Sequence, residues 1–150
     1  MVNLITDRSL EHVNLHRRLA EKGWSNMTTS ERTTWQSGDA TKGAYNYTDL
    51  NRVETAVAEL SEFFRLGLKT KTDWGNWDIP YLKEQGVERY LNNVKRVRDA
   101  CPSSLGFPTL PNSMDNLTYE GANNIEKVLV LAYQYAESIA RSGEIYSGEV

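Results

Sequence analysis

The sequence has a single cysteine, Cys101, among its 150 residues. One cysteine excludes an intramolecular disulfide and any metal cluster built on several thiolates. Cys101 stands just before Pro102, at the end of an expected helix, and we interpret it as a small, partly buried apolar residue. A nucleophilic cysteine needs a histidine beside it, and both histidines, His12 and His16, are far away in the sequence.

The chain also lacks a long apolar run and a large excess of charge of either sign. Its longest apolar stretch, residues 128–132, is far too short to span a bilayer, and no charged-then-apolar leader opens the chain. Seventeen basic residues against 20 acidic ones give a net charge of −3, which offers no support for phosphate-driven binding. We therefore expect no membrane and no nucleic acid as partner, and a protein made in the cytoplasm.

Groupings of reactive side chains are missing as well. His12 and His16 lie four apart on an expected helix, which suits a shared metal, but no further ligands with metal-site spacing accompany them. Gly38 and Gly43 lack the Lys-Ser/Thr ending that a phosphate-binding loop requires. The sequence therefore predicts a protein that is not an enzyme and that has neither a cofactor nor a metal.

What the sequence does contain is a series of helix signals. The first helix is expected to begin at Thr6 or Asp7, both suitable N-caps, and to end at Gly23. The second is expected to begin at Thr28, because Thr28 and Glu31 have the spacing of a capping box.

The clearest helix follows Thr48, which we expect to cap it, and ends by Gly67. Apolar residues at spacings of three and four place one stripe on this helix: Leu50, Val53, Val57, Leu60 and Phe64. The last helix is expected to begin at Thr118 and to stop before Gly143, with its own stripe: Ile125, Val128, Leu129, Ala132, Tyr135 or Tyr133, and Ile139.

Another helix is expected between these two, from Asp78-Ile79-Pro80 to Ala100, where Pro102 ends it. No run shows sustained alternation of period two, so the predicted fold is all-α. We expect an imperfect array of four to five helices with long connectors that contain aromatic residues and prolines. We expect this array to form a single helical domain over residues 1–150, with 1–67 and 68–150 as possible subdomains.

One sequence motif, the repeated phrase, recurs at the helix starts, and a weaker third copy lies in residues 85–94. Its two clear copies consist of Thr48, Asn51 and Glu54, and of Thr118, Asn123 and Glu126. A glutamate near a helix start complements the helix dipole and can reach free amides, so a structural role is favoured over catalysis by paired carboxylates. The asparagines can bond local backbone or bridge to a neighbouring connector.

Aromatic side chains concentrate in or beside the connectors, away from the helix stripes. The candidate subunit contacts among them are Trp24, Trp35, Trp74, Trp77, Tyr45 and Tyr47. These rings either fill gaps between helices or anchor contacts with other proteins, because aromatic groups bury a large area at a small entropic cost. We expect at least one of them to lie at a contact.

The order of several short motifs resembles a recurrent module of tail-associated structural proteins in phages and prophages of Gram-positive bacteria. The resemblance covers about residues 5–135. Its motifs are Ile5-Thr6-Asp7-Arg8, residues 22–28, residues 42–53, Lys71-Thr72-Asp73-Trp74, Asp78-Ile79-Pro80, residues 89–94, residues 110–114, residues 117–119 and residues 122–126.

The resemblance implies a non-enzymatic structural component of a virion tail or of a phage-derived tail-like particle, in the baseplate or fibre region. Such a protein would be assembled in the cytoplasm of the bacterial host. Its partners would be other tail, baseplate or fibre proteins, or further copies of the chain. The alternative is a soluble helical binding or regulatory module that a phage encodes and that acts on a host protein.

Overall fold

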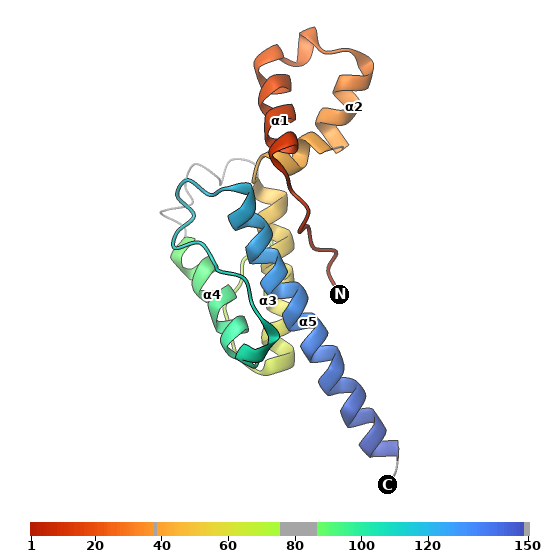
Figure 1. Cartoon of the computed structure of the whole chain (residues 1–150), viewed down its shortest axis with the longest axis vertical. Helices are drawn as coiled ribbons and strands as arrows, with labels where there is room; N and C mark the ends of the chain where they lie inside the picture. Colours follow the sequence, from red (N-terminus) through yellow and green to blue (C-terminus); the bar gives the residue numbers. More distant parts are fainter. Residues whose placement is uncertain (38, 76–86, 149–150) are drawn as a thin grey trace.

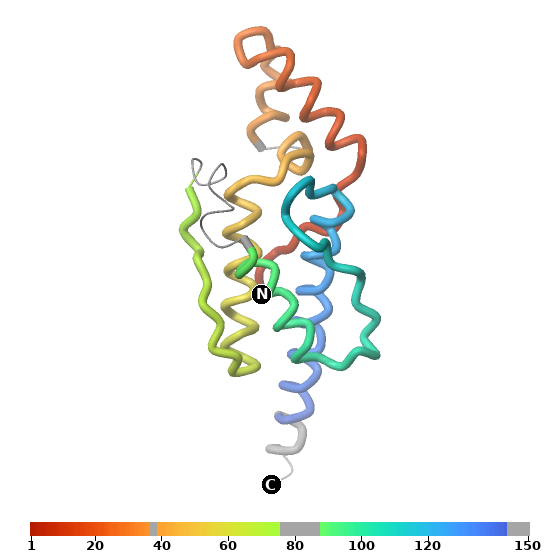
Figure 2. The backbone as a smooth tube through the Cα atoms, turned by 90° about the vertical axis from the view of Figure 1, so that its left-hand side faces the viewer, coloured from red at the N-terminus to blue at the C-terminus, as the bar shows by residue number. Residues whose placement is uncertain are grey.

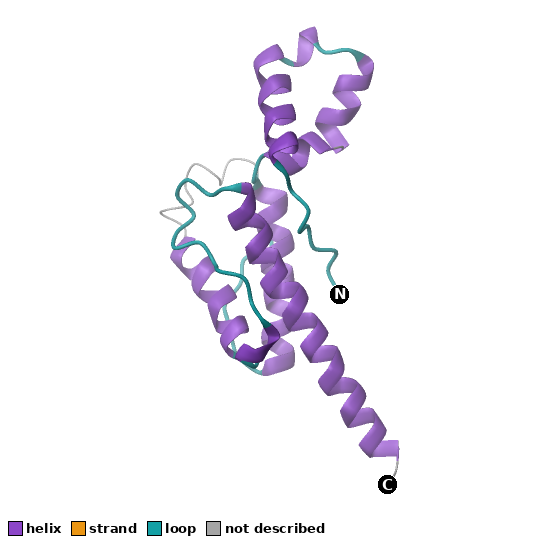
Figure 3. Ribbon diagram, in the orientation of Figure 1, coloured by secondary structure: helices purple, strands orange, loops and turns teal. Residues whose placement is uncertain are grey.

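The computed structural model describes residues 1–37, 39–75 and 87–148, and within these ranges it is helical, without strands, so the all-α prediction is confirmed. Figure 3 shows helices joined by loops. The α-helices are α1 (Leu10–Lys22), α2 (Thr29–Ser37), α3 (Tyr47–Phe64), α4 (Val87–Asp99) and α5 (Tyr119–Gly148). Three short 3-10 helices join them: η1 (Trp24–Asn26), η2 (Asp39–Gly43) and η4 (Ser103–Leu105).

The main body consists of α3, α4 and α5, each of which contacts the other two (Figure 1). The predicted stripe of α3 faces inward, since Leu50, Val53, Val57 and Leu60 are almost completely buried. They meet the stripe of α5, represented by Ile125 and Leu129, in one apolar core. The core takes residues from both sides of position 67.

A helical hairpin, residues 10–43, stands off from one end of this body (Figure 1). It contains α1, η1, α2 and η2, and its own small core consists of Leu19, Met27 and Ala40. Trp35 packs against that core and stacks on His16, with 4.8 Å between the ring centroids. Two backbone segments connect the hairpin to the body, one before Leu10 and one after Gly43.

Two extended segments lie along the helices of the body. Residues 1–9 form an N-terminal arm beside α5, and Val2 and Leu4 of this arm pack against the main core. Residues 66–75 run back along α3 (Figure 2). Both segments contribute to the sites described below.

The predicted helix starts are correct in two cases. The Thr28 hydroxyl accepts a hydrogen bond from the Glu31 amide at 3.1 Å, and the Glu31 carboxylate accepts one from the Thr28 amide at 3.0 Å. This is the predicted capping box. The Thr118 hydroxyl accepts from the Gly121 amide at 3.0 Å, so Thr118 caps α5 as expected.

Three helix ends differ from the prediction. Ser9, not Thr6 or Asp7, caps α1, because residues 5–8 are held in extended form against α5. Asn46 caps α3 in place of Thr48: its side chain accepts from the Thr48 amide, and Asp49 completes a capping box. The helix α5 continues past Gly143, since the preceding helix lowers the cost of adding further turns.

Glu31 is held by two donors, and its titration tests the start of α2. The Lys22 ammonium donates to Glu31 at 2.7 Å, and together with the Thr28 amide it lowers the pKa of Glu31 from 4.5 to about 2. This contribution to stability is therefore present above pH 4.5 and is lost as the pH falls toward 2. In Lys22→Met we expect the pKa of Glu31 to rise toward 4.5, measured by NMR titration of its side-chain carboxyl carbon. An unchanged pKa would contradict the contact.

Gly43 is placed where no larger residue fits. A Cβ atom there would lie 2.1 Å from the carbonyl oxygen of His12 and 2.8 Å from the Cβ of His16. We expect Gly43→Ala to lower the free energy of unfolding by about 1–3 kcal/mol, because η2 must move away from α1.

Gly143→Ala is the matched control, since the described residues leave open space around a Cβ in this part of α5. We expect it to stabilise the protein by about 0.5–1 kcal/mol, because alanine loses less backbone freedom than glycine in a helix. Thermal unfolding followed by circular dichroism measures both variants. A shift of the same sign in both would show that the contact at Gly43 is not responsible.

Candidate functional site

The two clear copies of the repeated phrase each hold an extended segment against a helix. In the first, the Asn51 side chain donates to the Trp74 carbonyl at 2.9 Å and accepts from the Trp74 amide at 2.7 Å. Glu54 accepts from the Lys71 amide at 3.0 Å and from the Trp74 indole at 2.9 Å. Arg89 of α4 binds the same carboxylate through two nitrogens, at 2.8 and 2.7 Å. We call this set the α3 joint.

The α5 joint has the same construction. The Asn123 side chain donates to the Arg8 carbonyl at 2.9 Å and accepts from the Arg8 amide at 3.0 Å. Glu126 accepts from the Ile5 amide at 2.9 Å. Arg52 of α3 binds the Glu126 carboxylate through two nitrogens, at 2.7 and 2.9 Å.

The two joints are equivalent residue by residue. In each, the asparagine lies five residues after the helix cap and the glutamate three residues later. In each, the glutamate accepts from an amide three residues before the residue that the asparagine holds. The held segments are Ile5-Thr6-Asp7-Arg8 and Lys71-Thr72-Asp73-Trp74, which share a central Thr-Asp.

The Thr-Asp pair that occurs in both held segments is therefore a second repeat in the sequence. It was not predicted, because only the helix starts were considered. Two roles were open for the asparagines, a bond to local backbone or a bridge to a neighbouring connector, and both joints contain the bridge. The role expected for the glutamates was incomplete. Glu54 and Glu126 accept from distant amides and from guanidinium groups, because burial leaves their charge in need of strong partners.

Four charged side chains meet at the α5 joint, and two of them, Arg52 and Glu126, belong to the joint itself. Arg8 donates to Asp49 at 3.0 Å and to Glu126 at 2.6 Å, and Arg52 contacts the same two carboxylates. Their side chains are 2% (Arg8), 5% (Asp49), 15% (Arg52) and 0% (Glu126) exposed. Two guanidinium groups and two carboxylates neutralise each other there. We call this set the buried charge cluster.

Two tyrosines border the cluster, Tyr90, which is buried, and Tyr45, which is half-buried. The hydroxyl groups of Tyr45 and Tyr90 are hydrogen-bonded, and the Arg8 guanidinium lies 5.6 Å from the centre of the Tyr45 ring. Burial raises the pKa of both tyrosines. They therefore stay neutral and serve to close the core around the cluster.

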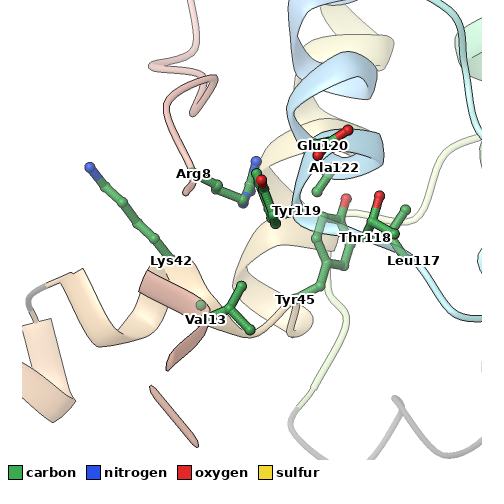
Figure 4. Close-up of a pocket in the computed structure, with 10 residues that line it drawn as sticks. Arg8, Val13, Lys42, Tyr45, Leu117, Thr118, Tyr119, Glu120 and Ala122 are labelled. Carbon is green, nitrogen blue, oxygen red and sulfur yellow. The ribbon is translucent and has the colours of Figure 1, made fainter. Parts of the chain in front are cut away.

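A cavity of about 350 Å³ opens where the hairpin, the arm and the start of α5 meet (Figure 4). Its lining includes Arg8 and Lys42 on one side, and Tyr45 and Thr118, which lie next to each other, on the other. Its cations are already engaged, Arg8 in the cluster and Lys42 with Asp7 at 3.0 Å. The described residues contain no group of three or more side chains placed to hold a metal ion.

The aromatic candidates lie in different environments. Trp74 is 2% exposed and fills the core beside α3, and Tyr45 and Tyr47 are half-buried and pack against the same core. Trp35 is half-buried in the hairpin. Trp24 is 46% exposed in η1, and Trp77 lies outside the described residues.

Comparisons with known proteins add no relative. Neither a family model, nor a curated protein, nor a solved structure matches the chain. Across the described residues, no helix is both long enough and apolar enough to cross a membrane.

Proposed function

We propose that the chain is a non-enzymatic structural component of a phage tail or of a phage-derived tail-like particle, in the baseplate or fibre region. It acts through protein–protein assembly. The main support for the proposal is that two motifs of the resemblance are also structural elements of the two joints. The motifs Ile5-Thr6-Asp7-Arg8 and Lys71-Thr72-Asp73-Trp74 are the segments that the two joints hold. On this proposal, the resemblance to the tail-associated module reflects the construction of a rigid unit.

The joints make that unit rigid before any partner binds. They hold connectors that would otherwise lose freedom on assembly, so less free energy is spent on ordering the interface. The buried charges of the joints are satisfied within the chain, and every buried polar side-chain atom of the described residues has a hydrogen-bond partner. In a symmetric particle, a modest contact per subunit is multiplied over many copies.

Mass spectrometry of particles purified from a producing strain tests the proposal. We expect the protein in the particles at a constant ratio to the known tail proteins through successive purification steps. An abundant cytoplasmic protein, followed in parallel, serves as the control for carry-over. A protein that is lost together with this control would overturn the proposal and favour the soluble module that acts on a host protein.

A further inference from the structure

We propose that the chain binds further copies of itself head to tail, with Trp24 of one copy seated in an apolar groove at the opposite end of the next. The inference rests on the proposed function, because it names one partner in the assembly. Three features support it. Trp24 is exposed and is contacted by Arg32, the groove has no helix over it, and Arg32 beside Trp24 is opposite in charge to Glu59 beside the groove.

Trp24 is the first residue of η1. The segment between α1 and α2, to which η1 belongs, forms the tip of the hairpin farthest from the body (Figure 1). The Arg32 guanidinium lies 4.9 Å from the centre of its ring, and Arg32 Nε donates to the Trp24 carbonyl at 3.1 Å. Trp24 is 46% exposed, and the Arg32 guanidinium over its ring restrains the orientation of the indole. Exposed aromatic groups of this kind are typical anchors of protein interfaces, since little freedom is lost when they are buried.

The groove is lined by the last turns of α3 and by residues 133–140 of α5. These turns of α3 are at the end of the body opposite to the hairpin, where α5 continues past α3 (Figures 1 and 2). It has a volume of about 270 Å³, and its apolar lining comprises Met1, Leu60, Phe63, Tyr133, Ala136 and Ala140. Phe63 is 43% exposed and Met1 is 74% exposed. The small side chains of Ala136 and Ala140 leave space over α5 that a ring can occupy.

The charges at the two places favour this pairing over others. In the described part of the chain, Arg32 has no carboxylate partner. Glu59 and Glu137 border the groove. Glu137 is paired with Arg141 at 3.5 Å, whereas Glu59 accepts a hydrogen bond from Tyr133 and has no ion pair among the described residues, so Glu59 is the carboxylate that can meet Arg32. Hairpin residues 10–43 carry five basic and four acidic residues, whereas the rest of the chain carries 12 and 16. Approach of the hairpin to the groove is therefore electrostatically favourable.

The positions of the two surfaces determine the form of the assembly. Because they lie at opposite ends of one chain, each copy keeps one free surface after pairing, and association continues into a ring or a filament. A second copy packed about a two-fold axis would instead bury the same surface on both partners.

Sedimentation velocity over a wide range of concentration tests the inference with three variants. We expect the wild type to form species larger than a dimer. Trp24→Ala removes the anchor and Ala140→Arg places a cation in the groove, and each is expected to weaken association at least about 30-fold. Leu10→Ala, which alters an exposed residue at the other end of α1, is the control and should associate like the wild type. Circular dichroism checks that every variant is folded.

An equimolar mixture of the two variants gives the decisive result. The Trp24→Ala copy keeps its groove and the Ala140→Arg copy keeps its tryptophan, so we expect one-to-one dimers and nothing larger. A mixture that stays monomeric while the wild type forms dimers would overturn the inference in favour of two-fold pairing. A wild type that is monomeric at every concentration would also overturn it, and the protein would still be found in particles if the proposed function is correct.

Discussion

Replacing Glu126 by glutamine is expected to lower the free energy of unfolding by about 3–5 kcal/mol. The substitution preserves the shape of the side chain but removes its charge. Arg8 and Arg52 would then share only Asp49, and the Arg8 side chain, at 2% exposure, is almost out of reach of water. An uncompensated buried charge is strongly destabilising because its hydration is lost without a replacement. Urea unfolding measures the loss, with an unchanged dependence on denaturant showing that the transition remains comparable.

The α3 joint provides the matched comparison. Glu54→Gln removes the same charge from the equivalent position, but its partner Arg89 is 28% exposed and can be hydrated. We expect a smaller loss there, about 1–3 kcal/mol. Glu137→Gln, on the exposed face of α5, should change stability by less than about 0.5 kcal/mol. Equal losses in the two joint variants would show that the buried charge cluster is not the reason for the effect.

Replacing Trp74 by alanine is expected to destabilise the protein by about 3–5 kcal/mol, because a large ring leaves the core beside α3. The indole also loses its hydrogen bond to Glu54, although the Asn51 contacts to the backbone remain. Chemical unfolding followed by tryptophan fluorescence and by circular dichroism measures the change.

Trp24→Ala is the control for this prediction, since it removes the same side chain from the protein surface. We expect a change below about 1 kcal/mol, because nearly half of the Trp24 residue is already exposed to solvent. Its effect should appear in association instead. If both variants lost the same stability, the division between a ring that fills the core and a ring that is free for a partner would be wrong.

Helix signals that depend on neighbouring residues could be read directly from the sequence. The stripe of Leu50, Val53 and Val57 faces the core as expected, because spacings of three and four place side chains on one side of any helix. The Thr28 capping box formed for the same reason, since both of its groups belong to one turn. These features need no information about the rest of the chain.

Helix starts with several good candidates needed more than local chemistry. Thr6, Asp7 and Ser9 all suit an N-cap, and Thr48 competes with Asn46 in the same way. The choice of Ser9 follows from the α5 joint, which holds residues 5–8 in extended form before a helix can begin. At α3, Asn46 prevails because Asp49 can complete its capping box.

The sequence by itself determined that this chain is helical, where its apolar stripes lie, and that one helix start is used twice. Only the tertiary structure decided what those helix starts hold. Arg8 and Asn123 are 115 residues apart, and no local sequence pattern predicts that the Arg8 amide will donate to the Asn123 side chain. The structure likewise separated Trp74 from Trp24, two tryptophans in connectors, because burial depends on which helices pack around a residue and not on the residues beside it in sequence.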